Sequence, residues 1–184
     1  MTNEEAVVVV IDALRSHSVD HVVVGSFASN FYGVPRSTQD IDFVVQLGNT
    51  SVHDIVKALG PAFQLDPQRG FETVTATQRH VIRLADGSFA IELFYLSEDA
   101  HDRERFQRRC RVTLLGRETF LLSVEDVVVT KLRWSGGVGR EKDLADLRNV
   151  IAVRQDAIDW VYVHRWCDLH GTRKTLDQIR TEIS

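Results

Sequence analysis

The sequence has few of the features that mark secreted or membrane-spanning proteins. Its 184 residues include only two cysteines, whose spacing suits neither a metal site nor a disulfide framework, so we expect an intracellular protein. The apolar run at residues 6–11 is too short to cross a bilayer, and no secretory signal is visible. We therefore expect a cytoplasmic protein without a membrane partner.

An excess of positive charge is also absent. The formal net charge is −4, so binding to nucleic acid would need a local basic patch. One candidate patch is a cluster of five arginines: Arg103, Arg105, Arg108, Arg109 and Arg111. A charge run of this kind is more often a solvated face, but it gives RNA a small edge over a metabolite or a protein as a partner.

Histidine chemistry has little support in the sequence. The seven histidines are scattered and lack the spacing of metal ligands. Ser26 has no nearby His and Asp in a hydrolase arrangement, which excludes a nucleophilic serine. The chemistry of this chain is therefore sought among its carboxylates.

What is present is enough apolar sequence for one folded core. Apolar residues make up 43% of the chain, and its length suits one domain, or one domain with a small helical extension. Strand-like and helical patterns alternate over residues 1–122, and the pattern is helical from residue 123 onward. We predict an α/β (α+β) core over residues 1–122 and a helical part over residues 123–184 packed on it.

Local patterns predict the individual elements. Strands are expected at residues 22–24, 40–46, 79–84 and 89–96, and as a hairpin at 109–115 and 118–122. Helices are expected at residues 3–17, 27–32, 51–59, 97–107, 123–134, 140–153, 155–169 and 172–182. A glycine-rich break at residues 135–139 separates two of these helices.

Three acidic side chains stand in two of the predicted strands. In an extended segment Asp40 and Asp42 point to one face and the apolar residues between them to the other. Glu92 lies in the apolar run 91–96, where an unpaired carboxylate would cost several kcal/mol, so a positive charge should stand beside it. If the two strands are neighbours, the most economical such charge is Mg²⁺ (or Mn²⁺) shared with Asp40 and Asp42.

Gly25 and Ser26 form a second candidate half of this site. Glycine permits close approach of the backbone to a ligand. Ser26, expected to cap the helix that follows, offers backbone N–H groups and a hydroxyl that suit a phosphate. Junctions of this kind are common, and simple capping explains them as well.

The order of these segments resembles the signature of the DNA polymerase beta nucleotidyltransferase superfamily. The matching stretches are Val24-Gly25-Ser26, Asp40-Ile41-Asp42 and Ile91-Glu92-Leu93. Residues 22–45 resemble small prokaryotic members, including the nucleotidyltransferase toxins of abortive-infection systems. Residues 123–126, 131–132 and 140–147 are similar to the helical segment that follows the catalytic sheet in those proteins. The third acid is Glu where Asp is commoner, and the tail after residue 153 matches no part of that pattern.

The resemblance implies a mixed sheet flanked by helices and an enzyme that moves a nucleoside monophosphate from an NTP to a hydroxyl of RNA, protein or a small molecule. Asp40 and Asp42 would hold two Mg²⁺ ions, and Glu92 would complete one ion's shell and help to remove the acceptor's proton. Gly25 and Ser26 would fix the β and γ phosphates. A toxin with an antitoxin partner is one protein of this kind.

Two basic residues have alternative roles. Lys131 either adds a positive charge to the triphosphate or pairs on its own helix with Glu125 or Asp126. Arg36 is either a triphosphate contact or a loop residue. Three further residues on the segment 140–147 either buttress Lys131 and the acids or take part in catalysis directly: Arg140, Asp143 and Asp146.

Two other functions compete with the enzyme hypothesis. The same fold could serve as a nucleotide sensor or antitoxin-like partner without turnover, although a pure binder has no need of three converging carboxylates. An Asp-x-Asp phosphatase of the haloacid-dehalogenase type would have a glycine after the acid pair. Phe43 follows the pair here, which argues against that type.

Overall fold

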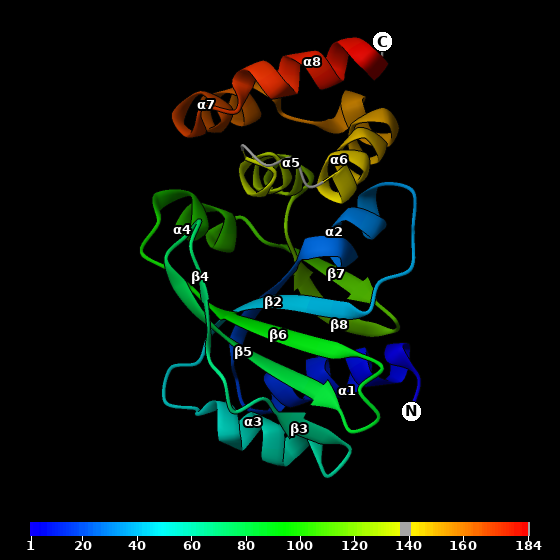
Figure 1. Cartoon of the computed structure of the whole chain (residues 1–184), viewed down its shortest axis with the longest axis vertical. Helices are drawn as coiled ribbons and strands as arrows, with labels where there is room; N and C mark the ends of the chain where they lie inside the picture. The colour runs from blue at the N-terminus through cyan, green and yellow to red at the C-terminus, as the bar shows by residue number, and fades with distance from the viewer. Residues whose placement is uncertain (137–140, 184) are drawn as a thin grey trace.

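The protein, described here from a computed structural model, is built on one mixed β-sheet with helices on both faces (Figure 1). The structure describes residues 1–136 and 141–183. The strands within these ranges are β1 Asp20–Val24, β2 Asp40–Gln46, β3 Phe63–Leu65, β4 Gly70–Glu72, β5 Thr77–Leu84, β6 Ala90–Tyr95, β7 Cys110–Leu114 and β8 Arg117–Leu121. Arg140 and most of the predicted glycine-rich break lie outside the described residues.

Helices cover the sheet and then continue beyond it. They are α1 Asn3–Ser16, α2 Gly25–Tyr32, α3 Val52–Leu59, α4 Ala100–Gln107, α5 Val124–Trp134, α6 Glu141–Arg154, the 3₁₀ turn η1 Gln155–Ala157, α7 Trp160–His170 and α8 Arg173–Ile183. Figure 1 shows α1 and α3 on one face of the sheet, α2 on the other, and α5–α8 gathered beyond α2. None of the described helices combines the length and apolarity needed to cross a membrane. That residues 1–122 and 123–184 form separate units stays a prediction.

The pairing of the strands brings the acidic segments together. The order across the sheet is β3-β5-β6-β2-β1-β8-β7, and β4 pairs with β5. β2 runs antiparallel to β1 and parallel to β6. The register places Asp42 between Val24 on one side and Glu92 on the other. The two acidic strands are therefore neighbours, which is the condition under which the three acids can share a cation.

Alternation along β2 separates the core from the site. Ile41, Phe43 and Val45 are fully buried among the side chains of the main core, whereas Asp40 and Asp42 keep part of their surface exposed on the opposite face. Burying three large apolar side chains on one face stabilises the strand by several kcal/mol, at about 1.5–3 kcal/mol each. The two carboxylates are thus displayed on a rigid element rather than on a loop.

Most predicted elements match the structure, and two short strands were not foreseen. The strand at residues 40–46 has the predicted limits, whereas β3 and β4 are absent from the sequence-based prediction. Each has three residues, too few to show an alternating pattern, and each forms by pairing with β5. The helix predicted at 155–169 is also wrong in its first turn, which is the 3₁₀ turn η1, and α7 starts at Trp160.

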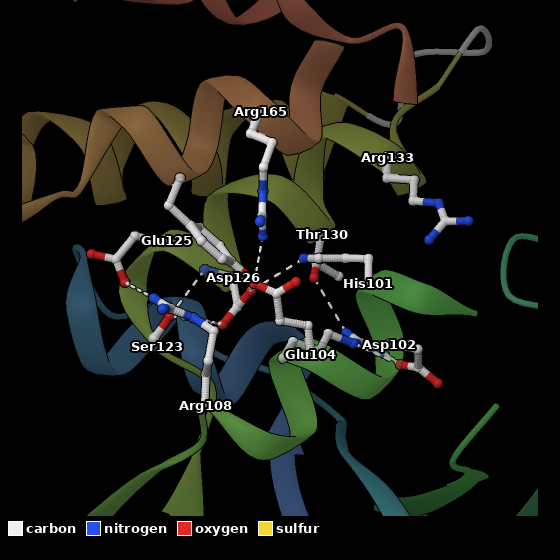
Figure 2. Close-up of polar contacts among 12 residues, drawn as sticks. His101, Asp102, Glu104, Arg108, Ser123, Glu125, Asp126, Thr130, Arg133 and Arg165 are labelled. Carbon is white, nitrogen blue, oxygen red and sulfur yellow. Dashed lines mark hydrogen bonds and ion pairs between the residues drawn. The ribbon is translucent and has the colours of Figure 1, made fainter. Parts of the chain in front are cut away.

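A buried polar network centred on Asp126 joins the C-terminal helices to α4 (Figure 2). Asp126, on α5, accepts hydrogen bonds from the hydroxyls of Ser123 (2.9 Å) and Tyr162 (2.7 Å) and contacts the ring of His101 at 3.1 Å. Arg108 adds an ion pair at 3.4 Å. Burial opposes ionisation of Asp126, but the hydrogen bonds from His101 and Tyr162 lower its pKa. The carboxylate therefore holds α4, α5 and α7 together.

Candidate functional site

The three predicted acids line a single cavity of about 690 Å³. Asp40 and Asp42 enter it from β2 and Glu92 from β6. The opposite wall comes from α5 and α6 and includes Lys131. Other lining residues belong to the start of α2, to β4, to β5 and to the turn between these two strands, and they include Gly25, Ser26, Phe71, Thr75, Thr77 and Arg79. A cavity of this size suits a small-molecule or cofactor ligand.

Negative charge is concentrated around Asp42. Burial, followed by the neighbouring charges of Asp40 and Glu92, raises the pKa of this carboxyl to about 7. Repulsion by Asp40 is the second largest cause of this pKa shift, and repulsion by Glu92 is the third. A cation placed among them would relieve this repulsion.

The positive group expected beside Glu92 is an arginine of the protein. Arg79, on β5, places its Nη1 2.5 Å from Oε2 of Glu92. The side chain of Glu92 is 18% exposed, so the strand is less enclosed than the sequence suggests. Sequence reasoning missed Arg79 because the contact depends on the register of β5 against β6. In this register Val81 lies opposite Glu92, and Arg79, two residues before Val81, is diagonal to Glu92.

The donor set fits a hard divalent cation in its chemistry, though it is not gathered into a cage. Among residues 1–136 and 141–183, no group of three or more His, Cys, Asp or Glu side chains is arranged to hold a metal ion. One oxygen of Glu92 is engaged by Arg79, and Thr38 donates a hydrogen bond to Oδ1 of Asp40 at 2.5 Å. Carboxylate oxygens are nevertheless the ligands that Mg²⁺ prefers. The site therefore fits a cation if Glu92 leaves Arg79.

The close approach of the Asp42 side chain requires a glycine at position 25. The φ of Gly25 is +62°, and a Cβ on this residue would lie 1.9 Å from Oδ2 of Asp42. The sequence suggested that this glycine makes room for a ligand. The structure shows that it makes room for the Asp42 carboxylate, which lies directly against the start of α2.

Ser26 is not the cap of α2, contrary to the sequence-based expectation. The helix starts at Gly25, its N-cap is Val24, and no side chain caps this end. Ser26 is buried, and its hydroxyl oxygen accepts a hydrogen bond from Nη2 of Arg36 at 2.9 Å. The hydroxyl hydrogen remains available to a ligand in the cavity, and the uncapped helix end offers backbone N–H groups.

Arg36 and Lys131 meet at one aspartate on α6. Arg36 forms a two-point ion pair with Asp146, Nε to Oδ1 at 2.6 Å and Nη2 to Oδ2 at 2.8 Å. Lys131 contacts Oδ2 of Asp146 at 2.9 Å and Oδ1 of Asp143 at 2.8 Å. Burial opposes ionisation of Asp146, but hydrogen bonds from Arg36 and Lys131 lower its pKa. This network ties Ser26 to α5 and α6.

The structure settles the partner of Lys131. Pairing with Glu125 or Asp126 on its own helix is wrong, because the ammonium lies between Asp143 and Asp146. Its charge is thereby offset by two carboxylates. Arg36 is not among the residues that line the cavity in the described part of the chain.

Lys142 is the lysine that sequence reasoning missed. It lines the same cavity and is exposed, and no hydrogen bond or ion pair joins it to any residue within 1–136 or 141–183. Its position next to Asp143, on the helix α6 whose aspartates pair with Lys131, is the signal that could have identified it. Of the two lysines in the wall, Lys142 has the charge that is free to meet a ligand.

The cluster of five arginines is neutralised within the protein. Each member has an acidic partner, and the pairs are Arg103–Glu98, Arg105–Asp102, Arg108–Asp126, Arg109–Asp20 and Arg111–Glu118. Three of these arginines also stack on aromatic rings: Arg105, Arg108 and Arg109. The cluster therefore gives no support to RNA as the acceptor.

Comparisons with known proteins identify the fold. No protein-family model and no curated protein matches the sequence. The chain is similar in structure to ANT(2")-Ia in complex with adenylyl-2"-tobramycin, with a TM-score of 0.64, 14% identity, and coverage of 95% of this chain and 99% of that one. It is also similar to an antigenic nucleotidyltransferase-like protein from Paracoccidioides brasiliensis, with a TM-score of 0.56, 18% identity, and coverage of 97% and 92%. A third similar structure is JHP933 from Helicobacter pylori, with a TM-score of 0.51, 14% identity, and coverage of 98% and 94%. The chain thus has the nucleotidyltransferase fold that the sequence resemblance implies.

Proposed function

We propose that the protein is a magnesium-dependent nucleotidyltransferase that moves a nucleoside monophosphate from an NTP to a hydroxyl acceptor. The observation that carries this proposal is the convergence of Asp40, Asp42 and Glu92 on one cavity whose opposite wall holds Lys142, a lysine without an ion pair to any described residue. Such an arrangement places cation ligands on one side and a phosphate partner on the other. The nucleotidyltransferase fold supports this proposal.

The triphosphate would bind at the α2 side of the cavity. The hydroxyl of Ser26 and the uncapped N–H groups of α2 would donate to phosphate oxygens, and Lys142 would approach from α6. Arg36 would act indirectly, because it donates a hydrogen bond to the hydroxyl oxygen of Ser26 and so directs the hydroxyl hydrogen of the serine into the cavity. Lys131 would position α6 through Asp143 and Asp146.

The carboxylates would serve the transfer step. In that step the acceptor oxygen bonds to the α-phosphorus, the bond from this phosphorus to its bridging oxygen breaks, and pyrophosphate leaves. Bound Mg²⁺ would supply activation of the acceptor hydroxyl and neutralisation of the leaving group. Asp40, Asp42 and Glu92 would hold the cation, and Glu92 would also take up the proton that the acceptor hydroxyl loses.

The acceptor would enter from the side formed by β4 and β5. Phe71 on β4 is 64% exposed at the rim of the cavity, and Thr75 and Thr77 follow along the same wall. An apolar ring beside polar side chains suits a small organic molecule or a protein hydroxyl better than a polyanion, because the arginine cluster that would favour RNA is paired. ANT(2")-Ia was crystallised with adenylyl-2"-tobramycin, and we extend a small-molecule acceptor to this chain as part of the proposal.

A transfer assay tests the proposal. The protein is incubated with Mg²⁺ and each of the four labelled NTPs in a cell extract, and the label is followed into protein, RNA and small molecules. We expect one fraction to acquire acid-stable label with the wild type and not with a variant carrying Asp40→Ala and Asp42→Ala. Equal labelling by the two proteins, or none by the wild type, would overturn the enzyme hypothesis.

A toxin role predicts a second effect of the substitutions at Asp40 and Asp42. If the acceptor is an essential cell component, expression of the wild type stops growth of the host and expression of the double Asp variant does not. Normal growth with both proteins removes the toxin role and leaves the transferase proposal in place. Strong thermal stabilisation by NTP without Mg²⁺, together with absence of transfer, would favour a nucleotide sensor.

A further inference from the structure

The position of Arg79 is fixed by three neighbours. Its guanidinium pairs with Glu92 and lies 5.8 Å from the centre of the Phe94 ring. Its side chain also passes over Gly70 on β4, where a Cβ would lie 2.6 Å from Nε and 2.8 Å from Cγ of the arginine. β4 is thus shaped to let Arg79 reach Glu92.

Arg79 occupies the place where a cation at this site would need a ligand. Among the basic side chains of the described residues, that of Arg79 forms an ion pair with one of the three acids. Lys131 and Lys142 act on Asp42 only through space, without a hydrogen bond to it. While Arg79 holds Oε2 of Glu92, that oxygen cannot also bind a divalent cation, because the two positive charges would lie within a few ångströms of each other.

We propose that Arg79 is an internal counter-cation that a divalent cation must displace from Glu92, so that Arg79 weakens cation binding and turns toward the β4 side of the cavity when the cation is bound. This inference rests on the proposed function in one respect, that the site binds a divalent cation. It explains why three carboxylates line one cavity and are nevertheless not arranged as a metal site among residues 1–136 and 141–183. The Arg79 guanidinium also relieves the repulsion that the cation would otherwise relieve, which stabilises the cation-free protein.

Removing Arg79 should strengthen cation binding. The probe is Mn²⁺ alone, titrated into the full-length protein, with free Mn²⁺ measured by electron paramagnetic resonance. Arg79→Met keeps an unbranched side chain but removes the charge, and we expect the Kd for Mn²⁺ to fall roughly 5- to 10-fold. Arg83→Met is the matched control, because Arg83 lies on the same strand and pairs at 3.8 Å with Asp66, away from the cavity, so its Kd should equal that of the wild type.

Two further variants separate displacement from simple support of Glu92. Gly70→Ala keeps the charge of Arg79 but pushes the side chain away, so it should also lower the Kd. In the Glu92→Gln background, Arg79→Met should change nothing, because the carboxylate for which the two cations compete is gone. If Arg79 instead supports Glu92 as a ligand, Arg79→Met and Gly70→Ala will weaken Mn²⁺ binding, and the inference is overturned.

The failures of the two proposals are distinguishable. Wild-type binding of Mn²⁺ that is abolished by Asp40→Ala and Asp42→Ala, with no effect of Arg79→Met, overturns this inference alone. Absence of Mn²⁺ binding in the wild type, Arg79→Met and Gly70→Ala proteins overturns the cation site itself and the proposed function with it. Thermal unfolding of each variant without metal shows that it is folded before the Kd is compared.

Discussion

The carboxylate of Asp42 fills the space that a side chain at position 25 would need. A Cβ on Gly25 would lie 1.9 Å from Oδ2 of Asp42, and the backbone at Gly25 has a φ of +62°. The start of α2 and the middle acid of the site are therefore packed against each other without an intervening group. This contact joins the proposed phosphate-binding end of α2 to the proposed cation ligands.

Replacing Gly25 with alanine should remove activity far beyond its effect on stability. The new Cβ displaces the Asp42 carboxylate, so we expect a loss of transfer of about 100-fold or more, as for a ligand moved by about 1 Å. Gly48→Ala is the control, because Gly48 has a φ of +58° and no atom within 4 Å of the new Cβ. It should lose about 1 kcal/mol of unfolding free energy from the positive φ and keep full activity. Equal activity of the two variants would contradict this assignment.

Substitutions of the two lysines of the cavity wall should affect different properties, the stability of the protein in one case and the affinity for NTP in the other. Lys131→Met leaves Asp143 without its cation and Asp146 with one cation fewer, so we expect a loss of about 3 kcal/mol in unfolding free energy. Lys142→Met breaks no ion pair among the described residues, so its stability should stay within about 0.5 kcal/mol of the wild type. NTP binding by Lys142→Met should weaken about tenfold, because a hydrogen bond to a charged phosphate is lost. Chemical unfolding and NTP titration measure the two effects, and unchanged NTP affinity of Lys142→Met would rule out its phosphate contact.

The sequence could predict the acids because their position follows from local periodicity. Asp40 and Asp42 share a face of β2, and Glu92 lies beside them because the register of a parallel pair is set by the apolar residues of both strands. The resemblance identified the same three positions. What it implied about the fold is confirmed, and the roles of these residues stay proposals.

The partners of the charged residues could not be predicted, because they depend on tertiary register. Arg79 on β5 reaches Glu92 on the neighbouring strand β6, and Asp146 reaches Arg36 over 110 residues of sequence. For Lys131 the sequence suggests either a triphosphate contact or a partner on its own helix, since only local pairs can be derived from helical spacing. The buried ammonium instead pairs with the next helix, where two aspartates are within reach.

Asp126 should be far more important for stability than its neighbours on the surface. Asp126→Asn removes the charge that pairs with Arg108 and places an NH₂ group where the hydroxyl of either Ser123 or Tyr162 now donates, because the two hydroxyls bond to different oxygens of the carboxylate. We expect a loss of about 3 kcal/mol in unfolding free energy. Glu104→Gln is the control, because its pair with Arg165 is partly exposed and should contribute about 1 kcal/mol or less. Urea unfolding followed by circular dichroism measures both values, and similar losses would show that the network adds nothing to the packing of the helices.

His170 should make the protein less stable as the solution becomes acidic. Burial, together with the charges of Arg133 and His101, lowers the pKa of His170 to about 4 against an opposing effect of Asp99. The ring packs with a centroid distance of 5.2 Å against His101 and 5.4 Å against Trp166.

The sign of the effect follows from proton counting. Between pH 6.5 and about 4 the unfolded chain binds a proton at position 170 and the folded protein does not, so stability is full above pH 6.5 and falls as the pH drops through this range. His170→Gln should reduce the slope of melting temperature against pH between 4 and 6.5. Part of the slope should remain, because burial also lowers the pKa of His101. His53→Gln is the control at an exposed position and should leave the slope unchanged. A wild-type slope in His170→Gln would mean that His170 binds its proton equally well in the folded and unfolded states. The acid sensitivity of the contact between α4 and α7 would then come from His101 alone.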